Sequence, residues 1–258
     1  MMFSTPLIQL NQVSKQYITR HRVVPAIHNI SFTIHEGEFV SLVGPSGCGK
    51  STILSLIAGL IHPSSGRIQI GKGSSVEERP QVGYMLQHDY LLKWRTVEKN
   101  LYLGLEIQKR DQRENREAAL RLLEEIGLLA YKDAYPDQLS GGMRQRVAFV
   151  RTLAIQPEIL LLDEPFSALD YQTKIQLEEL VKSTLKRHQK TGILVTHDIG
   201  EAIAMSDRIF LLSANPGALI HELSIPSELR EASPFAVRQL PIFQHYFEEI
   251  WKELRQHE

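Results

Sequence analysis

The chain has 258 residues, enough for one sizeable hydrophobic core or for one core with a smaller subdomain. Its hydrophobic content of 43% and charged content of 23% are ordinary for a globular protein, and its net charge of −1 gives no overall basic field of the kind that attracts nucleic acid. The single cysteine excludes an internal disulfide and any metal site that needs several cysteines.

The sequence predicts neither a membrane span nor a secretory leader. No apolar run reaches the roughly 18 residues that a spanning helix requires. Residues 1–6 lack the charged and apolar regions of a signal peptide. The lone Cys48 suits a reduced, cytosolic compartment. We therefore expect a chain that is neither secreted nor membrane-spanning, although it could still dock onto a membrane partner.

The first third of the chain is predicted to be mostly strands, with one helix over residues 52–60. Runs of β-branched and apolar residues alternate there with glycine, proline or charged turns. The expected strands are residues 7–17, 24–34, 39–44, 66–70 and 82–86.

A phosphate-binding loop is predicted between the third of these strands and the helix. Glycine backbone there can turn its N–H groups toward phosphate oxygens, and the helix N-terminus adds positive potential. Lys50 is expected against the β- and γ-phosphates of a nucleoside triphosphate, with the Ser51 hydroxyl on Mg²⁺. The alternative is a glycine-rich turn without chemistry, which the flanking strand and helix make weaker. The loop comprises Gly44, Pro45, Ser46, Gly47, Cys48, Gly49, Lys50, Ser51 and Thr52.

Residues 97–156 carry a helical pattern with few strand signals. The clearest helix is expected over residues 111–127, where Asp111 and Glu114 resemble a capping box and Gly127 can close the end. Its charged face is most simply a solvated face, with partner docking as the alternative.

A second glycine-rich helix start is predicted inside this region. Ser140 can cap a helix whose first N–H groups are left bare by Gly141 and Gly142, which makes another anion-binding terminus. Because the earlier loop already provides one phosphate site, this one makes most sense if it binds nucleotide on another copy of the chain. Taken alone, it is equally well explained as an ordinary loop-to-helix junction.

Strand and helix alternation returns after residue 157. The apolar run 159–162 predicts a buried parallel strand. Asp163 and Glu164 follow at its carboxyl end, where open α/β sheets bind ligands. Asp163 suits Mg²⁺, and Glu164 can polarise an attacking water as a general base. A solvated acidic turn is the alternative, which the upstream loop makes weaker.

The last third is predicted to continue this alternation. Asp170 can cap a helix to about residue 189, and Asp198 with Glu201 resembles a second capping box. Strands are expected over residues 193–196 and 208–213, followed by a turn at 215–217.

The tail over residues 235–254 is amphipathic. Its apolar stripe is expected to pack against the body, with a partner surface as the alternative. The stripe comprises Phe243, Tyr246, Phe247, Ile250, Trp251 and Leu254.

Together these elements predict an α/β fold. Its P-loop NTPase core covers about residues 1–87 and 157–234 and has an antiparallel β subdomain. An inserted α-helical subdomain covers about residues 88–156, and a C-terminal amphipathic helix covers about 235–256. We expect these parts to form one domain.

The motifs, in their order, resemble those of ATP-binding-cassette (ABC) transporter ATPases. Residues 139–142 with Gln145 and Arg146 resemble the family signature, residues 44–52 its Walker A loop and residues 159–164 its Walker B strand. Further matches are Tyr17 with the adenine-stacking aromatic, Gln87 with the Q-loop glutamine, residues 167–170 with the D-loop, and His197 with the switch histidine.

The resemblance implies a role for each of these residues. Two copies would close head-to-tail, with ATP between the Walker A loop of one and residues 140–142 of the other. Gln87 would contact Mg²⁺ and relay to the membrane partner, Asp170 would act across the interface, and His197 would contact the γ-phosphate. Taken alone, Tyr17 would more simply be a packed strand aromatic and His197 a buried, hydrogen-bonded histidine; their order with the other motifs favours the family roles.

Residues 88–100, the turn at 215–217 and the C-terminal helix are similar to ATPase subunits of nitrate, sulfonate and taurine importers. That group commonly has proline where Lys93 stands. The resemblance implies an ATP-hydrolysing subunit at the cytoplasmic face of the membrane, paired with an identical or related ATPase. Integral membrane permease subunits, and indirectly a solute-binding protein, would be its partners, with Trp94 and Arg95 near the groove for the permease.

The cargo is left open between a nitrate-, sulfonate- or taurine-type solute and a pyrimidine precursor, since the ATPase does not touch it. A soluble cassette ATPase of DNA repair or translation is the alternative function, but such proteins have long coiled coils or two cassettes. An unrelated Mg-ATPase would not need the signature motif. A purely regulatory module would be expected to lack Lys50 or Glu164, and both are present.

Overall fold

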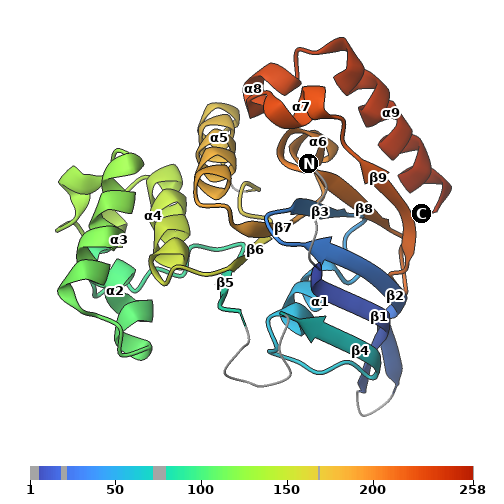
Figure 1. Ribbon diagram of the computed structural model, residues 1–258, viewed down its shortest axis with the longest axis horizontal. Helices are drawn as coiled ribbons and strands as arrows, with labels where there is room; N and C mark the ends of the chain where they lie inside the picture. Colours follow the sequence, from blue (N-terminus) through green and yellow to red (C-terminus); the bar gives the residue numbers. More distant parts are fainter. Residues whose placement is uncertain (1–5, 19–21, 72–79, 168, 258) are drawn as a thin grey trace. The chain divides into compact units, whose positions relative to one another are not determined.

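The computed structural model describes residues 6–18, 22–71, 80–167 and 169–257. It divides into two compact units, which are described separately. The first unit contains residues 1–80 and 182–258, and the second contains residues 81–181 (Figure 1). Ala168 of the predicted D-loop lies outside the described residues. Residues 1–5, part of the segment in which no signal peptide was predicted, also lie outside them.

The first unit contains an antiparallel sheet in the order β2-β1-β4 (Figure 1). Its buried face is formed by apolar residues of β1, including Ile8, Leu10 and Val13. The step from Leu10 to Val13 is three residues instead of two because Gln12 adopts a φ of 50° at an irregularity of the register. This local bulge returns Val13 to the buried face. The strands are β1 (Pro6–Ile18), β2 (Val23–His35) and β4 (Ser65–Ile70).

A second sheet of the first unit runs in the order β7-β3-β8-β9. β3 pairs in parallel with β7 and β8, and β9 pairs antiparallel with β8. All residues of β3 and β7 are buried, as expected for apolar strands of a parallel sheet. The strands are β3 (Phe39–Val43), β7 (Thr191–Thr196), β8 (Arg208–Leu212) and β9 (Leu219–Ser224), of which β9 was not predicted.

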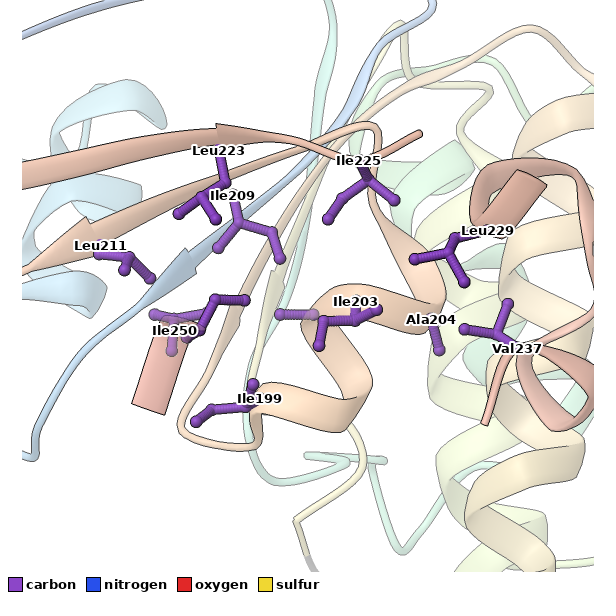
Figure 2. Close-up of a cluster of buried hydrophobic side chains, with 12 residues drawn as sticks. Ile199, Ile203, Ala204, Ile209, Leu211, Leu223, Ile225, Leu229, Val237 and Ile250 are labelled. Carbon is purple, nitrogen blue, oxygen red and sulfur yellow. The ribbon is translucent and has the colours of Figure 1, made fainter. Parts of the chain in front are cut away.

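Short helices follow β9 and pack with α6 and α9 around one apolar cluster of the first unit. Figure 2 shows Ile250 of α9 pointing toward Ile209 and Leu211 of β8 and toward Ile199 of α6. The Asp198 carboxylate accepts a hydrogen bond from the N–H of Glu201 and so caps α6, which confirms half of the predicted capping box. The N–H of Asp198 donates to the Thr196 hydroxyl, which takes the place of the expected Glu201 carboxylate. The first unit's helices are α1 (Lys50–Ile57), α6 (Ile199–Met205), α7 (Ser227–Glu231), α8 (Pro234–Val237) and α9 (Pro241–Gln256).

The tail prediction is confirmed for most of the apolar stripe but wrong for one residue. Ile250 is fully buried, and Phe243, Tyr246, Phe247 and Leu254 pack against the same cluster. Trp251 is instead 52% exposed. It follows Ile250 by one residue, which rotates it about 100° from the buried centre of the stripe.

The second unit contains two parallel strands and a group of helices. β6 is buried along its whole length and pairs with β5. α2, α3 and α4 pack against one another (Figure 1). α5 carries the chain from this unit into the first. The elements are β5 (Val82–Met85), α2 (Val97–Ile107), α3 (Arg113–Glu125), η2 (Leu129–Tyr131), η3 (Pro136–Gln138), α4 (Gly141–Ala154), β6 (Ile159–Asp163) and α5 (Tyr171–Arg187).

The capping box predicted at the start of α3 is wrong. The helix begins one residue later than the box requires, with Gln112 as its N-cap and Asp111 outside it. The Asp111 carboxylate accepts a hydrogen bond from the Arg116 guanidinium at 2.8 Å. A charged partner within the first turn therefore engages the side chain that was expected to cap the helix.

Across the part of the chain that the structure describes, no helix is both long enough and apolar enough to cross a membrane.

Candidate functional site

The predicted phosphate loop connects β3 to α1 in the first unit. Gly47 and Gly49 have φ values of 82° and 91°, in the left-handed region that favours glycine. Gly49 is the N-cap of α1, and within the described residues no side chain caps this helix. Its first turn also contains no acidic residue. The N–H groups and positive potential of the helix start therefore suit an anion, as the predicted phosphate site requires.

Lys50 lies folded back over the loop. Its ammonium is largely buried and donates hydrogen bonds to the carbonyl oxygens of Gly44 at 2.7 Å and Pro45 at 2.9 Å. Its third hydrogen-bond partner is the Cys48 sulfur at 3.8 Å, so the three groups that hold the ammonium are all uncharged. The geometry supports the predicted position of Lys50 against phosphate oxygens.

Cys48 is buried in the same loop and is a free thiol. Burial raises the pKa of this thiol, and the charge of Lys50 opposes that shift. The thiol is therefore neutral at physiological pH and acts as a small packing group rather than as a nucleophile.

His197 and the phosphate loop start at the same edge of one sheet. β3 and β7 are parallel, with Val43 opposite Thr196. The residues that follow, Gly44 and His197, therefore leave neighbouring strands at the same level. His197 is exposed, which rules out the alternative of a buried histidine.

Tyr17 lies near the end of β1 and is 42% exposed. The ammonium of Lys15 lies 5.5 Å from its ring centroid. An exposed ring of this kind offers a face for stacking, and the packed strand aromatic considered as the alternative is not what the structure contains.

Asp163 and Glu164 end β6 in the second unit, and their surroundings differ. Asp163 is mostly buried, and its Oδ2 accepts a hydrogen bond from the Tyr84 hydroxyl at 3.2 Å. Glu164 has a φ of 45°, a conformation that is uncommon outside glycine. Its carbonyl accepts a hydrogen bond from the Ser167 hydroxyl at 3.0 Å. This sharp turn gives the two adjacent carboxylates different directions.

The structure brings Gln87 to Glu164. The Gln87 side-chain amide donates to Glu164 Oε2 at 3.4 Å and to Ser167 Oγ at 3.5 Å. Both hydrogen bonds are long. An amide and a carboxylate predicted independently from motifs 77 residues apart are thus neighbours within the second unit.

Two residues of α4 hold this region: Gln145 was recognised only as part of the family signature, and Arg151 was missed by the sequence reasoning. Gln145 Nε2 donates to the carbonyl of Gln87 at 3.1 Å. The Arg151 guanidinium donates to the carbonyls of Asp89 and Tyr90 at 2.6 and 2.8 Å. The available signal was a single charged side chain, Arg151, within the otherwise buried stretch 147–154; Gln145 lies between two arginines and gave no such signal.

The second glycine-rich helix start is exposed. Ser140 caps α4 as predicted, since its hydroxyl accepts a hydrogen bond from the N–H of Met143 at 3.3 Å. Gly141 is exposed, whereas a Cβ on Gly142 would lie 2.3 Å from Thr173 Cγ2 of α5. Gly142 therefore permits two helices to approach, and Ser140 and Gly141 present polar groups to the surroundings.

Asp170 lies at the start of α5 and is exposed. Its Oδ1 accepts a hydrogen bond from the N–H of Thr173 at 3.1 Å, which caps the helix as predicted. Hydrogen bonds from the side chain and N–H of Thr173 lower the pKa of the Asp170 carboxyl, so the group remains ionised at neutral pH.

The predicted metal ligands are oxygen donors. Ser51 belongs to the first turn of α1 in the first unit, whereas Asp163 and Gln87 belong to the second unit. Among the described residues, no three His, Cys, Asp or Glu side chains form a group that could hold a metal ion. This donor set fits Mg²⁺, which proteins commonly bind through one or two side chains together with substrate phosphates.

One protein-family model matches the sequence of this chain. The model described as "ABC transporter" matches residues 27–167, more than half of the chain. The chain belongs to the ABC transporter family. The match to this ABC protein spans the predicted site residues 44–52, Gln87, 140–142, Asp163 and Glu164.

Similar ABC proteins cover from 80% to 96% of the chain. The uncharacterized ABC transporter ATP-binding protein YtlC of Bacillus subtilis is 52% identical over 96% of this chain and 95% of its own length. The nitrate import ATP-binding protein NrtD of Synechocystis is 38% identical over 96% of this chain and 95% of its own length. The aliphatic sulfonates import ATP-binding protein SsuB 1 of Rhodococcus jostii is 44% identical over 80% of each chain.

A solved ABC cassette has the same fold. The dimeric structure of a post-hydrolysis state of the ATP-binding cassette MJ0796, bound to ADP and Pi, has a TM-score of 0.71. It is 32% identical and covers 86% of this chain and 100% of its own. The α/β cassette fold with an antiparallel β subdomain and a helical subdomain is thus confirmed, and this ABC protein is an ATPase.

Proposed function

We propose that this chain is the ATP-hydrolysing subunit of an importer, attached to the cytoplasmic face of a membrane through permease subunits. The observation that carries the proposal is the start of α1. There an uncapped helix terminus and the ammonium of Lys50, held on two loop carbonyls, converge on one small loop. This combination suits a polyphosphate, because it offers several N–H donors and one cation, held within the loop, to a single anion.

The chain's own residues would bind the nucleotide in a fixed order along the ligand. Tyr17 would stack on the adenine, and residues 44–52 would enclose the phosphates. Lys50 would lie against the β- and γ-phosphates. Ser51, Gln87 and Asp163 would supply oxygen ligands for Mg²⁺, which when bound neutralises phosphate charge. The exposed ring of Tyr17 and the oxygen-only donor set support these assignments.

Glu164 would act as the general base for hydrolysis. Phosphoryl transfer to water needs positioning and charge stabilisation more than covalent chemistry, so one oriented carboxylate is sufficient for the water. The left-handed turn at Glu164 and its contact with Gln87 support this role. His197 would contact the γ-phosphate from the strand edge that it shares with the phosphate loop.

A second copy of the chain, or a related ATPase, would complete the site. Ser140, Gly141 and Gly142 would contact nucleotide held by the partner, and Asp170 would act across the interface. The exposure of Ser140 and Gly141 supports an external ligand. The likeness to MJ0796, which was solved as a dimer with ADP and Pi, supports a head-to-tail pair.

Import of a small solute is supported by the relatives. NrtD is named for nitrate and SsuB 1 for aliphatic sulfonates, and both cover most of this chain. We propose a small solute of this type, or a pyrimidine precursor, as the cargo. Trp94, which is 75% exposed in the second unit, lies in the segment expected to meet the permease.

Replacing Glu164 by Gln tests the proposal. The amide keeps the shape but cannot accept a proton, so ATP should bind, hydrolysis should fall at least about 100-fold, and an ATP-bound dimer should accumulate. Phosphate release and sedimentation with ATP and Mg²⁺ would measure these outcomes. Glu158→Gln is the matched control, since its carboxylate lies at the other end of β6 against the N–H of Gln81. Unchanged hydrolysis by Glu164→Gln would remove the base assignment.

The importer role needs a separate measurement. Affinity purification of the tagged chain from detergent-solubilised membranes of its own cell should recover a multi-span permease. Recovery from the soluble fraction alone, without a membrane partner, would contradict import and indicate a cassette ATPase that is not coupled to transport.

A further inference from the structure

The connection between β8 and β9 lies against the backbone of the phosphate loop, residues 44–52. β3 and β8 are parallel neighbours, with Val43 opposite Leu211, so the next residues, Gly44 and Leu212, lie side by side. A Cβ added to Gly44 would lie 2.7 Å from the Leu212 carbonyl oxygen. The loop therefore begins in backbone contact with this connection, which we call the 212–218 turn.

The other end of the 212–218 turn contacts the loop even more closely. A Cβ added to Gly217 would lie 1.8 Å from the carbonyl oxygen of Cys48. The obstacle is backbone, which cannot move aside as a flexible side chain can. Gly217 does not have a positive φ, unlike Gly47 and Gly49. Glycine is therefore required at position 217 for space and not for backbone conformation.

The 212–218 turn is itself fixed by hydrogen bonds. The Gly217 N–H donates to the Ala26 carbonyl at 3.0 Å, and the Gly217 carbonyl accepts from the N–H of His28 at 2.8 Å. Within the turn, the Ser213 hydroxyl accepts a hydrogen bond from the N–H of Ala218 at 3.1 Å. Both backbone hydrogen bonds of Gly217 thus go to β2, which holds Gly217 against Cys48.

The same stretch of β2 also limits the end of the phosphate loop. A Cβ on Gly49 would lie 2.4 Å from Ile27 Cγ2 and 2.8 Å from the Ala26 carbonyl oxygen. Ala26 therefore contacts both Gly49 and Gly217. Two successive loop residues, Cys48 and Gly49, are confined between β2 and the 212–218 turn.

We propose that Gly217 is a positioning residue for ATP binding: it fixes the Cys48 backbone and, through it, the direction of the loop's N–H groups. This inference rests on the proposed role of residues 44–52 as the phosphate site. Gly217 would not touch nucleotide. A side chain at this position pushes the Cys48 carbonyl away, which rotates the adjoining peptides out of the geometry that a phosphate requires.

Gly217→Ala tests the inference through nucleotide affinity. The dissociation constant for ATP, measured by titration calorimetry, should rise at least about 10-fold, because several N–H donors lose alignment together. The temperature of unfolding and the yield of folded protein would be measured on the same samples. An affinity equal to that of the wild type would overturn the inference.

Gly37→Ala is the matched control. Gly37 has a φ of 77°, and a Cβ there would meet no atom within 4 Å. The substitution should lower the unfolding temperature by roughly 2–4 °C through backbone strain alone while leaving the ATP affinity unchanged. A general loss of stability is thereby separated from a displaced loop, since only the displaced loop raises the dissociation constant in folded protein.

Ser213→Ala provides a second variant that adds no atoms. It removes the hydroxyl that binds the Ala218 N–H and should raise the dissociation constant for ATP roughly 2- to 10-fold. If Gly217→Ala fails to fold, unchanged affinity in Ser213→Ala overturns the inference. Lys50→Ala is measured alongside: normal ATP binding by Lys50→Ala would refute the phosphate site itself, whereas loss in Lys50→Ala with none in Gly217→Ala would refute only the role of Gly217.

Discussion

The helices α1 and α4 begin in similar ways. Each has glycine at its start, at Gly49 before α1 and at Gly141 and Gly142 in α4, and neither has an acidic residue in its first turn. Each therefore exposes positive potential at its N-terminus, which is the basic requirement for binding an anion. By this criterion alone the two helix starts would be equivalent sites.

Their surroundings make them different. At α1 the loop folds over itself, with Lys50 bound to the Gly44 and Pro45 carbonyls and Cys48 buried. At α4 the Ser140 hydroxyl already caps the helix, and Gly141 lies open to the surroundings. The α1 loop is thus closed around its own lysine, whereas the start of α4 is an open surface, which is why we propose that α4 acts only together with a second molecule.

The largest expected loss of ATP affinity and hydrolysis comes from a substitution in the α1 loop. Lys50→Ala removes the cation that lies within the α1 loop, so a single chain should lose most of its ATP affinity and hydrolysis should fall at least about 100-fold. Phosphate release and equilibrium titration would measure both. Lys93→Ala, at an exposed lysine paired with Asp137 at 3.6 Å, is the control and should behave as the wild type. Undiminished turnover in Lys50→Ala would end the distinction between the two helix starts.

Ser140→Arg, at the exposed start of α4, should abolish ATP hydrolysis. A large cationic side chain at the start of α4 would prevent close approach of the partner's nucleotide, so hydrolysis should fall at least about 100-fold and ATP-dependent dimers should disappear. Ser140→Ala is the comparison variant, because it removes the hydroxyl without adding bulk or charge and should cost about 1 kcal/mol of stability through the lost cap. Turnover by Ser140→Arg equal to that of Ser140→Ala would contradict the role assigned to this helix start.

A smaller effect is expected when the alkylation rate of a cysteine thiol is compared between the two helix starts. Burial raises the pKa of the Cys48 thiol, so alkylation should be slow and should accelerate only at high pH. In a Cys48→Ala background, Ser140→Cys should react at least about 10-fold faster, because Ser140 is exposed. Mass spectrometry after timed alkylation at several pH values would measure both. Equal rates would show that the α1 loop is as open as the start of α4.

The sequence predicted the locally determined parts of the fold. Strands such as β6 and β7 are continuous apolar runs, and the glycines of the α1 loop are required by local backbone conformation. β9 was missed because its residues alternate only partly and it lies at a sheet edge, where the hydrophobic pattern is weak. The capping box at Asp111 was wrong because Arg116 provides a competing charged partner.

The parts of the site that depend on distant residues were not predictable. Gly217 was interpreted only as part of a turn, yet its contact with Cys48 joins positions far apart in the chain. The contact between Gln145 and the Gln87 carbonyl is of the same kind. A motif indicates which residues meet the ligand, whereas packing between elements decides which other residues hold them in place.

The most direct test of the difference between the two helix starts is the ATP affinity of dilute, monomeric Ser140→Arg. We predict the same dissociation constant as for the wild type, together with lost turnover, because the start of α4 acts on nucleotide held by another chain. A dissociation constant that rises in parallel with the loss of turnover would contradict the account, since Ser140 would then bind the nucleotide of its own chain.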